Sequence, residues 1–265
     1  MNEKDRVRIE QLNWVEYDAR VREQQPVIFL PVGAVEQHGP HLPMNCDEVI
    51  PREISEEVAR NVEGLVAPSL FYGYKSQPRT GGGNHFPGTT SLSAEAMIAS
   101  VRDVIGEFAR HGARRMVLMD GHSENTMFII EGIDLALREL ARDGVTDMKI
   151  LRIGYYEFTS AETEAAVWPD GFPSWPLEHA GMMETSVMLY RHPELVDMSQ
   201  LPTDVPAKFP PYDVYPVNFE NLPTLPRSGA LNSAKRATAE IGKLMFDEYV
   251  TEIAGAVTEE FGLRR

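Results

Sequence analysis

The sequence predicts an α/β fold: a single domain with a mainly parallel central sheet flanked by helices. Short apolar segments of strand length alternate along the chain with amphipathic segments of helical length, which is the order of a parallel sheet with crossover helices. Neither an internal repeat nor a clear linker divides the chain, so we assign residues 1–265 to one domain. A chain of this length can bury a substantial core.

The first half of the chain contains two expected strands, two expected helices and one long loop. Proline is favoured at a first helical position, so Pro51 is expected near the start of the first helix. Ser93 is expected to cap the second helix. The strands are expected at 26–32 and 66–70, the helices at 51–64 and 94–112, and the loop, rich in glycine and proline, at 73–91. A long ordered loop is usually functional.

The second half repeats the alternation and then changes character. Residues 201–227 contain seven prolines and are expected to form an extended arm over a surface or across a subunit contact. The strands are expected at 114–120 and 148–156, and the helices at 126–144, at 180–191 and over most of 233–261.

Composition excludes several classes of partner. A formal charge of −15 argues against binding to nucleic acid or to an anionic membrane surface. The N-terminus lacks the apolar stretch of a signal peptide. No apolar segment is close to the length of about 18 residues that a membrane-spanning helix needs. The one cysteine, Cys46, fits a reducing compartment. We expect a cytoplasmic protein that acts on a small molecule.

Two polar clusters follow strands in the expected sheet. Glu36 and His38 are two residues apart, as are His122 and Glu124, and this spacing puts both members of a pair on one face of an extended segment. Ligands of parallel sheets bind at the carboxyl ends of strands, where these pairs and Asp47 are expected to lie. Five mixed oxygen and nitrogen donors suit zinc or manganese, and the charge sum suits two ions.

One Glu-x-His pair after a strand is weak on its own, because a histidine there often only bonds a backbone carbonyl. Two pairs in matching positions make a metal site as probable as a purely structural role for these residues. A metal-loaded ligand-binding protein without turnover, or a metal-stabilised structural oligomer, stays open at this point.

Longer motifs narrow the choice. The segments LPVGAVEQHGPHLPMNCD, YGYKSQPRTGGGNHFPGTTSL and EHAGMMETSVML resemble the creatininase family, particularly its creatinine-hydrolysing branch. The resemblance extends from about residue 10 into the final helix. It implies a sheet flanked by helices, a homohexamer, and zinc and manganese as the usual ions.

The resemblance also implies roles for individual residues. Glu36 and His122 would hold one ion, His38 and Glu124 the other, and Asp47 would bridge them. Glu124 is also expected to take part in catalysis. His179 is expected to move protons, which an imidazole does well near neutral pH. Trp175 is expected to line the substrate pocket beside Glu178, and Glu184 matches a glutamate near the family's site, although its position alone predicts a solvated helix residue.

Four pocket positions depart from the creatinine-hydrolysing pattern. Ser123 stands in place of a tyrosine, Tyr156 of a tryptophan, Pro176 of an aspartate and Thr80 of a serine. We still expect Thr80, Ser123 and Tyr156 to contact substrate. The expected reaction is the opening of creatinine to creatine by water activated between two metal ions. Hydrolysis of another lactam or of a formamide is the alternative that these departures leave open.

Overall fold

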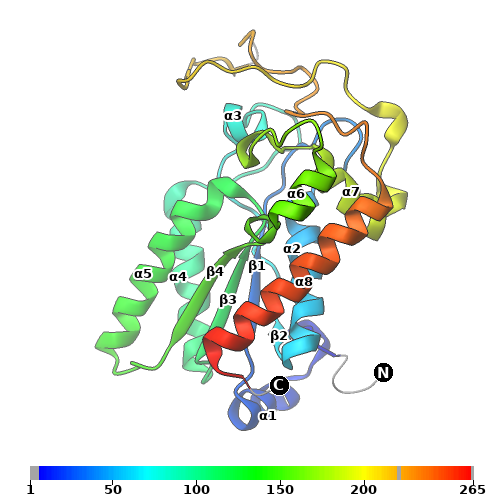
Figure 1. Cartoon of the computed structure of the whole chain (residues 1–265). Coiled ribbons are helices and arrows are strands. Elements are labelled where there is room, and N and C mark those ends of the chain that lie inside the picture. Colours follow the sequence, from blue (N-terminus) through cyan, green and yellow to red (C-terminus); the bar gives the residue numbers. More distant parts are fainter. Residues whose placement is uncertain (1–5, 220–221, 264–265) are drawn as a thin grey trace.

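A four-stranded parallel sheet forms the centre of the computed structural model, which describes residues 6–219 and 222–263 (Figure 1). The strand order is β2-β1-β3-β4. The strands are β1 (Ile28–Val32), β2 (Leu65–Val66), β3 (Arg115–Asp120) and β4 (Lys149–Gly154). The predicted α/β fold with a parallel sheet flanked by helices is confirmed.

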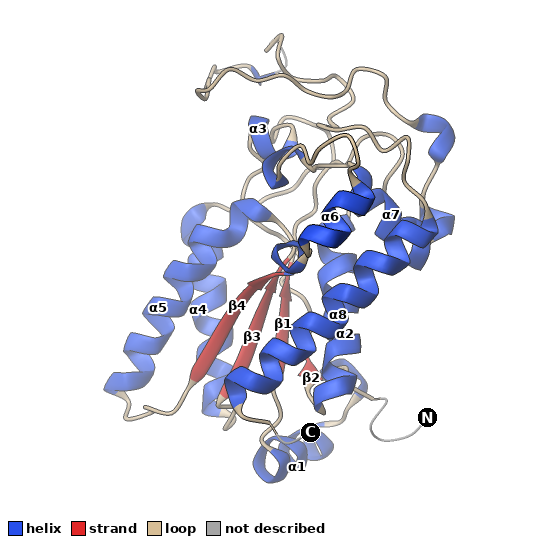
Figure 2. Ribbon diagram, viewed as in Figure 1, coloured by secondary structure: helices blue, strands red, loops and turns tan. Residues whose placement is uncertain are grey.

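Helices cover both faces of the sheet. In Figure 2, α4 and α5 lie on one side, and α2 and α8 lie on the other. The helices are α1 (Trp14–Gln24), α2 (Cys46–Val62), α3 (Pro78–Gly81), α4 (Ala94–Arg110), α5 (Thr126–Arg142), α6 (Ala161–Val167), α7 (Met182–Arg191) and α8 (Ala239–Phe261). Within the described ranges, no helix combines the length and the apolar character needed to cross a membrane.

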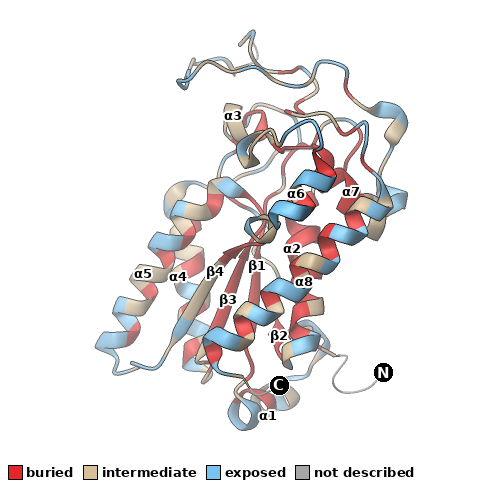
Figure 3. Ribbon diagram, viewed as in Figure 1, coloured by how far each residue is buried: buried red, intermediate tan, exposed pale blue. Residues whose placement is uncertain are grey.

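The alternation of strand side chains divides the interior into two cores. Ile28 and Leu30 pack with α4 and α5, whereas Phe29 between them packs with α2, α7 and α8. All three are fully buried, and Figure 3 shows β1 and β3 buried along most of their length, whereas much of β4 is only partly buried. A strand covered on both sides needs apolar residues at every position, which explains the continuous apolar run that predicted β1.

The chain adds strands toward opposite edges of the sheet on the two sides of the central pair β1 and β3. From β1 the chain crosses through α2 to β2 on one edge, while β3 continues through α5 to β4 on the other edge. The carboxyl ends of β1 and β3 therefore lie side by side, with Val32 paired to Asp120. Such a topological switch point leaves a crevice where ligands bind.

One predicted helix start was wrong. α2 begins at Cys46, five residues before Pro51, so this proline lies inside the helix. It is tolerated there because its missing N–H affects only the carbonyl of Asp47, at the edge of the first turn. α8 occupies most of 233–261, as predicted, and begins at Ala239, because the side chain of Thr238 caps it by accepting a hydrogen bond from the Ile241 N–H.

Other differences are smaller. The second strand is shorter than 66–70: β2 ends at Val66, and Leu70 makes only an isolated bridge to Val32. Helices α1 and α6 were not expected, and the short helix α3 lies inside the segment 73–91 that was predicted as a loop. α1 carries a detectable signal, since Asn13 and Glu16 form a capping box at its start.

The proline-rich arm extends away from the helical layers, near α3 (Figure 1). Among its described residues, several large apolar side chains are exposed, including Tyr212, Tyr215 and Val217. Arg79 of α3 lies 3.3 Å from Asp213 of the arm, which ties the two segments together. The arm is largely irregular and extended, as predicted, and its place in a subunit contact stays a prediction.

Candidate metal centre and active site

Glycines at two strand ends let α2 approach the sheet closely. A Cβ atom on Gly33 would lie 2.7 Å from the Asp47 carbonyl oxygen, and one on Gly121 would lie 2.2 Å from the same atom. Neither distance is possible for a real side chain. The first turn of α2 therefore fits between the ends of β1 and β3 only because both positions are glycine, and this places Asp47 between the two polar clusters.

His122 is surrounded by carboxylates. Its Nδ1 atom lies 3.1 Å from Glu36 Oε2, 3.2 Å from Asp47 Oδ2 and 3.6 Å from Glu124 Oε2. The other ring nitrogen, Nε2, lies 3.1 Å from the Tyr74 carbonyl oxygen, to which it can donate. A histidine anchored in this way through one nitrogen presents the other to a ligand.

His38 faces the opposite side of Asp47. Its Nε2 atom lies 3.1 Å from Asp47 Oδ1 and 3.5 Å from Glu184 Oε1. Its Nδ1 lies 3.1 Å from the carbonyl oxygen of Glu36, again an anchoring contact. The two oxygens of Asp47 thus face two different imidazoles, which is the arrangement of a carboxylate that bridges two ions.

Three atoms at the centre of this cluster make no hydrogen bond within the described part of the chain. They are Glu36 Oε1, His38 Nε2 and Asp47 Oδ2, and all are buried. Buried polar atoms are costly without partners, so convergent nitrogen and oxygen atoms of this kind are suited to bind a cation. The residues present therefore fit divalent metal ions, and the mixture of imidazole and carboxylate suits zinc or manganese.

The ionisation of the cluster is strongly perturbed. Burial raises the pKa of Glu36 to about 7, although His122 opposes the shift. For His38, burial disfavours the charged form, but the Asp47 and Glu184 carboxylates outweigh burial and raise the pKa well above its ordinary value. Protons therefore occupy the cluster at neutral pH when cations do not.

Glu124 is held by the loop that contains α3. Thr80 donates a hydrogen bond of 2.5 Å to Glu124 Oε1, the Gln77 N–H donates to the same oxygen at 3.0 Å, and Ser123 donates to Oε2 at 2.9 Å. In this arrangement Glu124 lies on the His122 side of the cluster. The carboxylates beside His38 Nε2 are those of Asp47 and Glu184.

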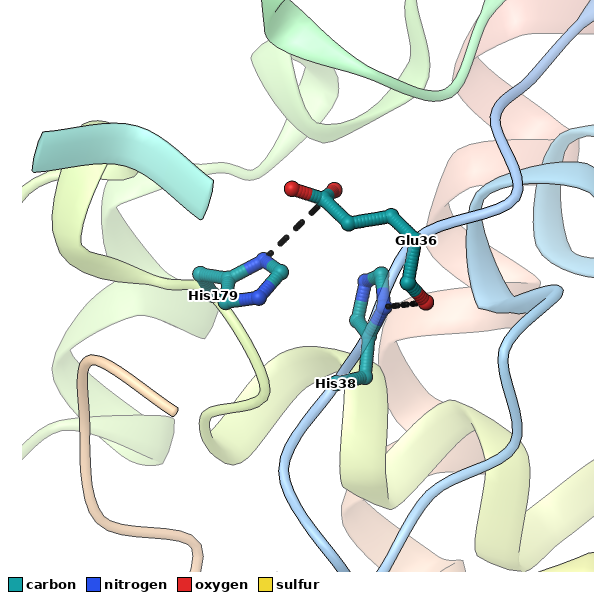
Figure 4. A group of neighbouring side chains, drawn as sticks. All are labelled: Glu36, His38 and His179. Atoms are coloured by element: carbon teal, nitrogen blue, oxygen red, sulfur yellow. Dashed lines mark hydrogen bonds and ion pairs between the residues drawn. The ribbon is translucent and has the colours of Figure 1, made fainter. Parts of the chain in front are cut away.

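His179 reaches the cluster from the segment before α7. Figure 4 shows one edge of its ring turned toward Glu36, with the ring of His38 beside it. Its Nδ1 lies 3.9 Å from Glu36 Oε2, and the two imidazole centres are 4.4 Å apart. Burial lowers the pKa of His179 well below its ordinary value, and the charge of His38 adds to the shift. His179 is therefore neutral at physiological pH.

Aromatic side chains form one wall of the pocket above the cluster. The ring centroids of Tyr156 and Trp175 are 5.3 Å apart, and those of Trp175 and Phe172 are 4.6 Å apart. The pocket brings together the predicted site residues other than His38. Its lining is Glu36, Asp47, Thr80, Gly121, His122, Ser123, Glu124, Tyr155, Tyr156, Trp175, Glu178, His179, Met183 and Glu184. The lining combines charged, polar and aromatic side chains, as in a site for a small polar molecule.

Glu178 lines the pocket, but both of its oxygens have protein partners. The Met183 N–H donates to Oε1 at 2.6 Å, and Asn232 Nδ2 donates to Oε2 at 3.2 Å. Burial raises the pKa of Glu178 to about 8, so the carboxyl is largely protonated at neutral pH. Its clearest structural role is to bind the first turn of α7.

Two residues of the site were not identified from the sequence pattern. The expectation of a solvated Glu184 was wrong, because this residue is buried beside His38 and its Oε2 accepts a hydrogen bond from the Ala180 N–H. Gln37 lies between two predicted ligands and contacts His179 at 2.9 Å. Its position between Glu36 and His38 was the only signal available.

Comparison with known proteins agrees with this geometry. The creatininase family model, described as creatinine amidohydrolase, matches residues 10–257. The chain belongs to the creatininase family. A creatinine amidohydrolase of Pseudomonas putida is 50% identical over 252 residues, covering 95% of this chain and 96% of the relative. A mycofactocin precursor peptide peptidase of Mycobacterium ulcerans is 30% identical and covers 88% of this chain and 84% of its own.

Solved creatininase structures superpose closely on the chain. A manganese creatininase and a glutamate-to-glutamine variant of Zn-Zn type are each 49% identical, with TM-scores of 0.92 and 0.93. A glutamate-to-glutamine variant in complex with creatine matches equally well, at 49% identity and a TM-score of 0.92. Each covers 96% of this chain and 98% of its own.

Proposed function

We propose that this chain is a metal-dependent cyclic amidohydrolase that converts creatinine and water to creatine. The observation that carries the proposal is the buried group of convergent carboxylates and imidazoles that opens into an aromatic-walled pocket. The 50% identity to a creatinine amidohydrolase over nearly the whole chain supports the choice of substrate. A proton-handling imidazole beside the cluster favours an enzyme over a binding protein without turnover.

Two divalent cations, zinc or manganese, are proposed for the cluster. Asp47 would contribute to both, since its two oxygens face different imidazoles. The first ion would be held by Glu36, His122 and Asp47 with Glu124 on the same side, and the second by His38, Asp47 and Glu184. In this set Glu184 is the carboxylate ligand beside His38, whereas the family resemblance pairs His38 with Glu124. Bound cations lower the pKa of a water molecule and polarise an amide carbonyl.

His179 and Glu124 are proposed to act during the reaction. His179 is buried, neutral and turned toward the cluster through Nδ1, so it can transfer a proton to the ring nitrogen that leaves. Glu124 is oriented by Thr80 and Ser123, which keep its carboxylate at the pocket surface. A carboxylate in this position can hold the attacking water or its proton.

The substrate ring is proposed to lie against the aromatic wall. Trp175 and Tyr156 present flat faces suited to a planar, conjugated ring. Thr80, Ser123 and Glu178 supply polar groups around it, and the raised pKa of Glu178 allows its carboxyl to donate a hydrogen bond. The aromatic wall keeps water from one side of the ring, which strengthens the electrostatic interactions inside the pocket.

A different cyclic amide is the second candidate. Ser123 and Tyr156 remove aromatic bulk relative to the creatinine-hydrolysing pattern, and Pro176 removes a carboxylate that would pair with a basic ring. The resulting pocket is less selective for a small guanidine-like ring. The peptidase among the relatives shows that the family includes hydrolysis of other amides.

Activity assays separate these functions. Purified protein loaded with zinc or manganese is incubated with creatinine and with a panel of lactams, cyclic ureas and formamides, and product is followed by NMR. Creatine formation is the expected result. Turnover of a lactam without turnover of creatinine would establish the second candidate, and tight binding without turnover of any compound would refute an enzymatic role.

We also propose a cytoplasmic homohexamer. The family resemblance supports the hexamer, and the exposed apolar side chains of the arm, such as Tyr215 and Val217, are suited to contact between subunits. The single buried cysteine and the high negative charge support a reducing, membrane-free environment. Light scattering of the purified protein measures the oligomer directly.

A further inference from the structure

The side chain of Gln37 points away from the metal cluster, although its neighbours in sequence point into it. Its amide is buried and connects three distant segments of the chain. The Gly39 N–H donates to Gln37 Oε1 at 2.9 Å, and Nε2 donates to the carbonyl oxygens of Gly81 at 2.9 Å and Gly229 at 3.0 Å. The same nitrogen lies 2.9 Å from His179 Nε2.

Glycines leave the space that this amide occupies. A Cβ atom on Gly229 would lie 1.9 Å from Gln37 Oε1, and one on Gly82 would lie 2.8 Å from Gln37 Nε2. Both glycines also have positive φ angles, so a side chain at either position would be strained and would collide with the amide. The glycine-rich loop and the return of the arm are thus shaped around Gln37.

These contacts determine which way the amide faces. The reversed orientation would place the NH₂ group against the Gly39 N–H and the oxygen against two carbonyl oxygens. The nitrogen that meets His179 is therefore a donor with two hydrogens for three neighbouring acceptors, so one hydrogen is shared with His179 Nε2. An amide nitrogen has no lone pair with which to accept. A proton on His179 Nε2 would meet another donor. With no proton on Nε2, the ring carries its proton on Nδ1, which lies 3.9 Å from Glu36 Oε2.

We infer that Gln37 is a positioning residue, which holds His179 with Nε2 as acceptor and Nδ1–H directed at the substrate. The inference rests on the proposed hydrolytic function and specifies the state in which the imidazole meets the substrate. When water attacks, its proton is taken by the Glu124 carboxylate. As the C–N bond breaks, the leaving nitrogen takes the Nδ1 proton in concert with transfer of the Glu124 proton to Nδ1, so the ring begins and ends neutral and the step is balanced.

Gln37→Glu tests the inference directly. A carboxylate of nearly the same shape accepts where the amide donated, so it favours a proton on His179 Nε2. In zinc-loaded protein labelled with ¹⁵N-histidine, the wild type is expected to show His179 protonated at Nδ1, and the variant to show it protonated at Nε2. The signal is assigned by its loss in His179→Ala. Unchanged protonation in Gln37→Glu would overturn the inference.

Kinetics give an independent test of the same idea. Gln37→Glu is expected to lower kcat by about 10- to 100-fold with little change in KM, as for residues that orient a functional side chain. In a His179→Ala background, the Gln37→Glu change should cost nothing more, because it acts through the missing ring. An additive loss in the double variant would show that Gln37 acts elsewhere.

Thr89→Val is the matched control. Thr89 Oγ1 accepts a hydrogen bond from the backbone N–H of Gln37 but does not contact the amide side chain. This variant is expected to lower Tm slightly and to leave the His179 tautomer unchanged. The NMR measurement needs no turnover, so a failure of the proposed hydrolysis would leave the tautomer result standing as a separate outcome. A changed tautomer in Thr89→Val would mean that any disturbance of the segment moves the ring.

Discussion

The metal cluster and the substrate wall are built in different ways. Glu36, His38 and Asp47 are almost fully buried and follow directly from the ends of sheet strands or the first turn of a packed helix. Tyr156 and Trp175 are only partly buried and belong to short 3₁₀ turns in connecting segments. Changing a cluster residue disturbs the core, whereas a wall residue can change with little effect on folding. The chemistry is therefore fixed by the sheet, and specificity is left to loops.

The largest effect is expected from removal of the Asp47 carboxylate, which is proposed to bind both metal ions. Asp47→Ala should remove at least one metal ion per chain and nearly all activity, because the remaining ligands cannot hold two cations close together. Elemental analysis and the hydrolysis assay measure both losses. Asp103→Ala, an exposed aspartate of α4, is the control and should change neither. Full metal content in Asp47→Ala would show that the cluster does not depend on this carboxylate.

The next effect concerns the proton-handling imidazole. His179→Ala should retain both metals and lower kcat by about 10²- to 10⁴-fold, the usual contribution of a general acid–base group. His111→Ala, which removes a histidine paired with Tyr17 far from the pocket, should leave kcat unchanged. Wild-type turnover in His179→Ala would reduce His179 to a structural residue.

Metal affinity should rise with pH. The pKa of Glu36 is raised to about 7 and that of His38 is raised above its ordinary value, so the metal-free cluster binds protons at neutral pH. Cations must displace these protons, and each proton displaced changes the affinity about tenfold per pH unit. Competition with a chelator at pH 6 and pH 7 should show weaker binding at pH 6. Equal affinity at the two values would mean that the cluster is deprotonated before metal binds.

The smallest effect concerns the wall. The combined change Ser123→Tyr, Tyr156→Trp and Pro176→Asp should raise kcat/KM for creatinine by about tenfold, by restoring aromatic contact and a carboxylate for a basic ring. The three changes should be coupled, since the residues share one pocket. Steady-state kinetics at equal metal loading measures the effect, with metal content unchanged. A lower kcat/KM in the triple variant would show that the wall does not set specificity in this way.

The sequence by itself determined the fold class and the metal-binding character of the protein. Apolar strands alternating with amphipathic helices predict a layered α/β structure, and the Glu36–His38 and His122–Glu124 pairs after strands, together with the family resemblance, predict a metal site. Even the closeness of these pairs was predictable, because parallel strands bring their carboxyl ends to one edge of the sheet. These features are local or topological, so a linear pattern contains them.

Only the tertiary structure decided which residues from distant segments come together at the metal site. Glu184 and His179 reach the cluster from α7 and the segment before it, and nothing in their own sequence positions distinguishes them from surface residues. The placement of Asp47 depends on Gly33 and Gly121, whose missing side chains admit the first turn of α2. Gln37 finds its partners in loops 44 and 192 residues away. Such contacts depend on packing between segments far apart in the chain, and local sequence patterns do not record it.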